Sequence, residues 1–123
     1  MATVESKSID HKLVTAKNFE VQRALFAEMG GDRGAAQRHF LAAGHLELVL
    51  GEDYQQADKG FFALRSYLSA ASCFWRAGQL GEARLLFKDL LRKYPQRKKY
   101  IGSVITDLEK SYPATKAKKK RGA

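Results

Sequence analysis

The chain of 123 residues carries 22 Lys and Arg against 13 Asp and Glu, for a net charge of +9, and 45% of its residues are hydrophobic. This length suits one domain, and the composition is that of a folded protein rather than a disordered one. No run of 18 apolar residues, no apolar core of a secretory signal within residues 1–10 and no partner for the single Cys73 are present. A membrane span, secretion and an oxidising compartment are therefore not expected, and the predicted location is cytoplasmic.

Apolar residues recur at helical spacing along most of the chain, and no segment shows the alternation of a strand. The fold class expected is all-α, with a flexible N-terminus over residues 1–8, a helical domain over 9–112 and a disordered basic tail over 113–123. Helices are predicted over residues 9–29, 33–50, 61–77, 80–94 and 97–111.

Local signals fix most of the expected helix ends. Gly30 and Gly31 end the first helix, Asp32 stands where an N-cap belongs, Gly78 follows the third helix and Pro95 ends the fourth. Residues 51–60 are polar, and they fit either a loop or a frayed extension of the second helix.

The chain also resembles itself at a shift of 47 residues. The matching pairs are Ala24 with Ala71, Gly31 with Gly78, Gly34 with Gly81, Ala36 with Ala83, and Phe40 with Phe87. Glycine suits the turn between antiparallel helices, alanine allows close helix contact, and phenylalanine fills the space beside that contact. The pattern predicts two similar helical hairpins.

These residues resemble a known repeat. The best-matching positions, over residues 64–97, are Tyr67, Ala71, Phe74, Gly78, Leu80, Ala83, Phe87, Leu90 and Pro95, and they resemble a tetratricopeptide repeat. A weaker match covers residues 17–50, and the spacing of 47 departs from the family's usual period of about 34. The resemblance implies two tetratricopeptide-like hairpins, with residues 97–111 as a C-terminal capping helix.

In that family the first helix of each pair lines a concave groove. The resemblance therefore implies a partner-binding groove lined by Asn18, Val21, Gln22, Leu25, Met29, Arg65, Leu68, Ser69, Ser72, Trp75 and Arg76. Such a surface suits a short peptide or a helix with an acidic group near an apolar anchor. The alternative is that Leu68 and Trp75 pack against the additional segment 51–63 or against a neighbouring helix.

No pattern of catalytic or metal-binding residues stands out. His39 and His45 are six residues apart, which places them on nearly opposite helix faces, and neither has a second ligand at metal-binding spacing. Cys73 lacks an evident base, and Gly30 to Gly34 lacks the features of a phosphate-binding loop. No catalytic residue, metal or cofactor is expected, and the protein is predicted not to be an enzyme.

The positive charge lies in two stretches. The first contains Arg84, Lys88, Arg92, Lys93, Arg97, Lys98 and Lys99, and the second, in the tail, contains Lys118, Lys119, Lys120 and Arg121. The first suits either phosphate contacts or a solvated helix face with cations near the C-terminal dipole. The tail suits a nuclear-import signal, if the source is eukaryotic, or an electrostatic arm for nucleic acid or anionic lipid.

These features favour a non-enzymatic adaptor or scaffold that binds another protein, as a peptide or helix, through the groove. The alternative is a small basic protein that binds nucleic acid or a ribonucleoprotein through residues 84–99 and the tail. A homodimer is a third interpretation, because the first helix is apolar on two sides, with Val21 and Leu25 on one and Phe19 and Phe26 on the other.

Overall fold

The computed structural model describes residues 9–113, and over this range the chain is all-helical without any strand. In chain order the helices are α1 (His11–Met29), α2 (Arg33–Gln56), α3 (Gly60–Arg76), α4 (Leu80–Lys93), the short 3-10 helix η1 (Pro95–Arg97) and α5 (Lys98–Ser111). The predicted all-α class is confirmed. The predictions for residues 1–8 and for the tail, including Lys118, Lys119, Lys120 and Arg121, lie outside the described residues.

The turns after α1 and α3 are built alike. Gly31 and Gly78 have φ of 79° and 84°, in the left-handed region that glycine adopts at least cost. The amide of Asp32 donates to the carbonyl of Ala27 at 2.9 Å, and 47 residues on, the amide of Gln79 donates to that of Phe74 at 2.8 Å. Asp32 then caps α2, because its carboxylate accepts from the Ala35 amide at 3.1 Å.

The second helix is longer than predicted. It continues six residues past Leu50, to Gln56, so more than half of the segment 51–60, expected to be loop or frayed helix, is regular helix. The reason is packing, because Gly51 is buried where the Tyr67 ring of α3 crosses α2. A turn at Asp58, with φ of 60°, then leads into α3.

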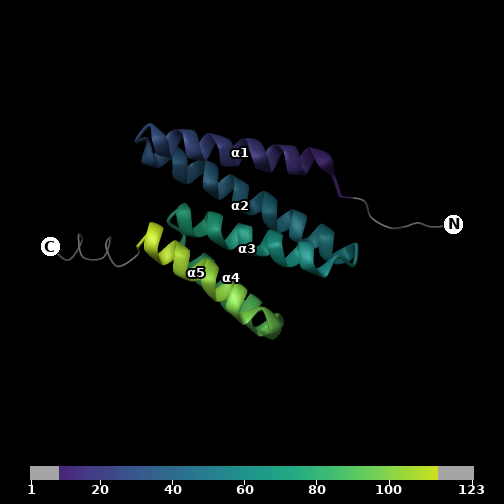
Figure 1. The fold of residues 1–123 in the computed structure, drawn as a ribbon. Helices are drawn as coiled ribbons and strands as arrows, with labels where there is room; N and C mark the ends of the chain where they lie inside the picture. Colours follow the sequence, from purple (N-terminus) through teal and green to yellow (C-terminus); the bar gives the residue numbers. More distant parts are fainter. Residues whose placement is uncertain (1–8, 114–123) are drawn as a thin grey trace.

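The helices lie one after another, with α2 between α1 and α3, and with α4 and α5 beyond α3 (Figure 1). Helix α2 packs against both α1 and α3, α3 packs against α4, and α5 packs across both α3 and α4. The main core lies among α3, α4 and α5, where Phe74, Phe87, Leu90, Ile101 and Leu108 are buried.

A second, smaller core joins α1, α2 and α3. Its buried members are Ala24, Ala36, Phe40, Ala43, Cys73 and Ala77. Four of these six are alanine, so the helices approach closely here but bury little apolar area. Ala24 is the only buried residue of α1. The other side chains of that helix are therefore at least partly exposed.

Candidate functional site

The residues predicted to line one groove lie on two separate surfaces. Asn18, Gln22, Leu25 and Met29 are exposed on α1, and Val21 is half-buried against α2. The other six come from α3, on the far side of α2 (Figure 1). The described residues therefore do not bring the two sets together as one concave lining.

Two members of the α3 set are core residues. Leu68 and Trp75 are only 4% and 3% exposed, so the prediction that they line an open groove is wrong. The indole Nε1 of Trp75 donates to the carbonyl oxygen of Tyr112 at 2.9 Å, and the Arg84 guanidinium lies 5.5 Å from its ring. The alternative, that these side chains pack against a neighbouring helix, is confirmed.

The remaining α3 residues are divided among different roles. The Ser72 hydroxyl donates to the Leu68 carbonyl at 2.9 Å, which satisfies it within its own helix. Ser69 is half-buried. The Arg76 guanidinium lies over the rings of Phe40 and Tyr112, at 5.3 and 5.2 Å, and so joins α2, α3 and the end of α5. Arg65 is exposed at the opposite end of α3.

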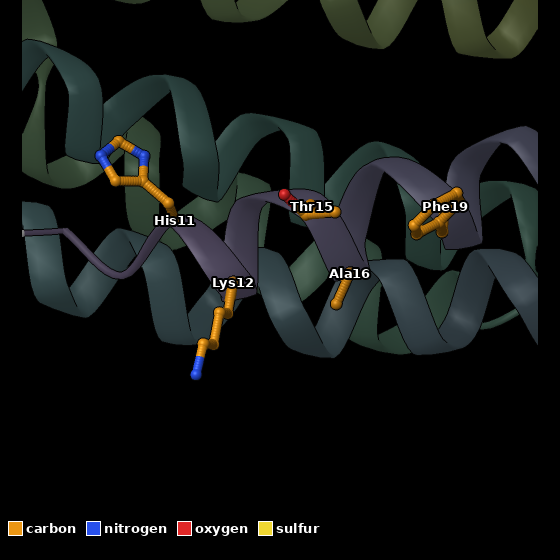
Figure 2. A pocket seen from close by; sticks show the side chains of 5 residues that line it. All are labelled: His11, Lys12, Thr15, Ala16 and Phe19. Carbon is orange, nitrogen blue, oxygen red and sulfur yellow. The ribbon is translucent and has the colours of Figure 1, made fainter.

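The outer face of α1, the side turned away from α2, exposes three large apolar side chains. Phe19, Phe26 and Met29 are 54%, 70% and 80% exposed and are separated by seven and three residues. This spacing places the three side chains on one helix face. An open hollow adjoins Phe19, lined also by His11, Lys12, Thr15 and Ala16 (Figure 2).

The equivalent face of α3 is covered. At the shift of 47, Ala16, Phe19, Arg23 and Phe26 of α1 correspond to Ala63, Ser66, Ala70 and Cys73 of α3. All four α3 residues are buried, whereas on α1 only Ala16 is shielded, and only in part. The face that α3 buries is thus left open on α1.

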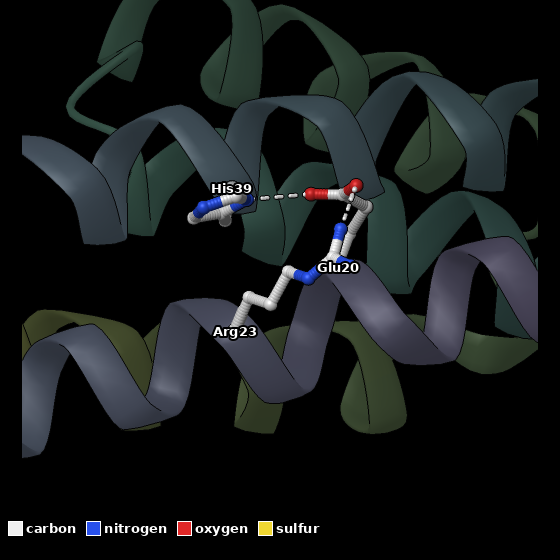
Figure 3. Close-up of polar contacts among 3 residues, drawn as sticks. All are labelled: Glu20, Arg23 and His39. Carbon is white, nitrogen blue, oxygen red and sulfur yellow. Dashed lines mark hydrogen bonds and ion pairs between the residues drawn. The ribbon is translucent and has the colours of Figure 1, made fainter.

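Polar contacts attach α1 to the rest of the molecule. Glu20 bonds to Nδ1 of His39 on α2 at 2.6 Å and pairs with Arg23 at 3.4 Å (Figure 3). The Lys17 ammonium pairs with the buried Glu47 carboxylate of α2 at 3.5 Å. At the other end of α1, the Tyr112 hydroxyl donates to Glu28 at 2.9 Å. Burial, together with this hydrogen bond, raises the pKa of Tyr112.

All seven cations of the basic segment 84–99 are exposed: Arg84, Lys88, Arg92, Lys93, Arg97, Lys98 and Lys99. Arg92 and Lys93 both pair with Asp89 and lie in the last turn of α4, where cations suit the helix dipole. The solvated-face interpretation therefore accounts for these two. The other five form no ion pair with any carboxylate of residues 9–113.

Three elements meet in a group of aromatic and cationic side chains, which we name the aromatic corner: Tyr54 of α2, Phe61, Phe62 and Arg65 of α3, and Arg97 of η1. The Phe62 ring stacks on Tyr54 at 5.6 Å and meets Phe61 edge-on at 6.2 Å. The guanidinium of Arg97 lies 5.0 Å from the Phe61 ring, and that of Arg65 lies 5.9 Å from the Phe62 ring. The sequence pattern does not predict this group, whose only local signal is the adjacent pair Phe61-Phe62.

The one cysteine is shielded from solvent chemistry. Cys73 is buried, and burial first, then the Glu47 carboxylate, raises the pKa of its thiol to about 11. A thiol with that pKa is almost wholly protonated near neutral pH and is a poor nucleophile. Within residues 9–113, no group of three or more His, Cys, Asp or Glu side chains is placed to hold a metal ion, and no helix is long and apolar enough to cross a membrane.

Neither family models, nor curated proteins, nor solved structures gave a significant match to this chain. The geometry of the described residues leaves two candidate sites: the outer face of α1, and the aromatic corner with the basic segment beside it.

Proposed function

We propose that this chain is a non-enzymatic adaptor that binds an amphipathic helix of a partner protein on the outer face of α1. The observation that carries the proposal is the stripe of Phe19, Phe26 and Met29, each more than half exposed on one face. Large aromatic side chains gathered in one exposed patch are typical anchors of protein interfaces.

The contrast between α1 and α3 supports a helix as the partner. On α3 the corresponding face is covered by α2, which packs lengthwise against it. A helix that lay on α1 as α2 lies on α3 would cover Phe19 and Phe26 and extend the stack by one element. Partner helices commonly bind in this way, with apolar residues spaced three and four apart.

The resemblance to tetratricopeptide repeats supports the same class of function. Proteins of that family are known for binding peptides and helices, and Asn18, Gln22 and Leu25, predicted to contact a partner, remain exposed beside the stripe. Leu68 and Trp75 are withdrawn from the proposed surface, because they are buried.

The test compares two substitutions of equally exposed apolar residues on different faces. Phe26→Glu changes the stripe, and Leu85→Glu, also at a residue 70% exposed, changes the outer face of α4. We expect Phe26→Glu to reduce recovery of the partner in affinity capture at least tenfold, since burying an unpaired carboxylate in an apolar interface is costly. Leu85→Glu is expected to leave recovery unchanged.

Equal recovery with both variants would contradict the proposal. Sedimentation of the purified chain tests whether the partner is a second copy of the same chain. A dimer of the wild type that Phe26→Glu dissociates would assign the stripe to self-association rather than to a different protein.

A second candidate function is binding of nucleic acid or a ribonucleoprotein through the basic segment. The observation that favours it is the run Arg97, Lys98 and Lys99, which has no ion pair with a described carboxylate. Its signature would be an affinity for polynucleotide that falls steeply as salt rises.

A further inference from the structure

The aromatic corner holds its arginines without neutralising them. Each guanidinium lies against a phenyl ring, Arg97 on Phe61 and Arg65 on Phe62, and neither pairs with a described carboxylate. A ring contact restricts the side chain yet leaves its charge available, whereas a carboxylate would compete with an incoming anion. The guanidiniums are therefore oriented in advance for an anionic ligand, which lowers the entropy cost of binding.

The surrounding charges are also predominantly positive. Lys59 precedes α3, and Lys98 and Lys99 follow Arg97 directly in the chain. The nearest acidic residues in sequence are Glu52 and Asp53, in the last turns of α2, and Asp58, on the α2–α3 connection. None of the three forms an ion pair with a described cation, and cations outnumber them around the corner.

Helix stability does not explain these cations. Arg97, Lys98 and Lys99 stand at the N-terminal end of α5, whose first turn contains no acidic residue. Cations at that end are unfavourable to the helix dipole by a few tenths of a kcal/mol each. The contrast is with Arg92 and Lys93, which lie at the favourable end of α4. Positive charge at this unfavourable end of α5 is better explained by binding of an anionic ligand than by helix stability.

The exposed rings narrow the class of ligand. Phe61 and Phe62 remain 47% and 45% exposed, although Arg97 lies over the Phe61 ring and Tyr54 stacks on the Phe62 ring. Such rings offer surface on which a flat group can stack, but they project less than Phe26 or Met29 and are poorly suited to insertion into a lipid layer. An acidic peptide would meet the cations but would leave the rings unused unless it also carried an apolar side chain.

We infer that the aromatic corner is a binding site for single-stranded nucleic acid, in which bases stack on Phe61 and Phe62 and phosphates contact Arg65, Arg97, Lys98 and Lys99. The inference rests on the second candidate function, nucleic-acid binding. It adds the site and the form of nucleic acid that binds there. Unpaired bases expose the faces that stacking requires, whereas a duplex hides them. Exposed Lys88 and Arg84, one and two helical turns before Arg92 on α4, would extend the phosphate path.

The test measures fluorescence anisotropy of a labelled 20-nucleotide oligothymidylate, an abasic strand of the same length and a duplex, each with the full chain. We expect the oligothymidylate to bind about tenfold more tightly than the abasic strand, an ordinary contribution for base stacking on aromatic residues. Phe61→Leu with Phe62→Leu keeps most of the apolar volume and is expected to remove this tenfold preference. Affinity for the abasic strand should fall much less, because that strand loses only the orientation of the two arginines.

Two further variants complete the design. Lys98→Gln with Lys99→Gln is expected to weaken binding to all three probes and to lower the salt dependence by about two phosphate contacts. Val49→Ala, at an apolar residue of α2 that is as exposed as Phe61, is the control and should leave every affinity unchanged. Circular dichroism of each variant confirms that the helices are intact.

The outcomes separate the inference from the function beneath it. Equal affinity for thymidylate and abasic strands, or a base preference that survives loss of both rings, would overturn the stacking site while leaving electrostatic nucleic-acid binding in place. Failure of the wild type to bind any polynucleotide at low salt would refute the second candidate function, and the inference with it. Binding instead to vesicles containing phosphatidylserine, or to a polyglutamate peptide, would identify the corner as a lipid or protein surface.

Discussion

The two ends of the helical stack are finished in different ways. At one end α5 lies across α3 and α4, and it buries Ile101 and Leu108 in the main core. At the other end α1 buries only Ala24 and leaves Phe19, Phe26 and Met29 exposed. The chain thus supplies its own cover for the last hairpin and none, within residues 9–113, for the first.

The two terminal helices are also attached by different forces. Helix α5 is held chiefly by apolar burial, which depends little on salt. Helix α1 is held by the buried Ala24, by half-buried Val21 and Ala27, and by polar links such as Lys17 with Glu47. Regions with few buried apolar contacts open first. We therefore expect α1, which carries the proposed partner surface, to be the less stably held end.

The largest expected effect tests the apolar cover directly. Ile101→Ala removes a fully buried side chain and should lower the free energy of unfolding by about 2–5 kcal/mol. Phe26→Ala removes a larger side chain from the exposed face of α1 and should change it by less than about 0.5 kcal/mol. Urea unfolding followed by circular dichroism measures both.

Similar losses for the two variants would contradict the comparison, because they would show that the outer face of α1 is buried in the native protein. If the loss at Phe26 appeared only at high protein concentration, a second copy would be covering the stripe.

The helix ends could be predicted because they depend on local chemistry. Asp32 caps its helix through an amide three residues away, and Gly31 and Gly78 adopt the left-handed conformation that few other residues tolerate. The burial of Trp75 could not be predicted in the same way. Several faces of α3 carry apolar residues, and the packing of α5 decides which face is covered. Trp75 bonds to Tyr112, which directly follows α5 and lies 37 residues further along the chain.

The aromatic corner shows a second limit of the same kind. Phe61 and Phe62 are adjacent in the sequence, but Arg97 reaches them only because α4 returns the chain along α3. The four-residue spacing of Arg84, Lys88 and Arg92 predicts one basic stripe that the later cations continue. Only the structure separates the cations paired with Asp89 from those left unpaired beside aromatic rings.

A second prediction sharpens the contrast in how the ends are attached. Lys17→Met leaves the buried carboxylate of Glu47 without its partner and should destabilise the protein by about 2 kcal/mol, less than a fully buried pair would lose because Lys17 is partly exposed. Hydrogen exchange should locate the loss in α1 rather than in α5.

The matched control is Arg23→Met, also on α1. Arg23 pairs with Glu20 but is mostly exposed, so its loss should change stability by no more than about 0.5 kcal/mol. Equal effects at Lys17 and Arg23 would show that the Glu47 pair does not hold α1 in place.

The smallest expected effect concerns the close contact between α2 and α3. A methyl group at Gly51 would lie 2.7 Å from the Tyr67 ring, whereas one at Gly102 of α5 would meet no atom within 4 Å. Gly51→Ala should therefore destabilise by about 1–2 kcal/mol, as overpacking outweighs the gain in helix propensity. Gly102→Ala should stabilise by up to about 1 kcal/mol. Thermal unfolding distinguishes the opposite signs. A stabilising Gly51→Ala would mean that α2 and α3 are not in close contact. The covered face of α3, and hence its contrast with α1, depends on that contact.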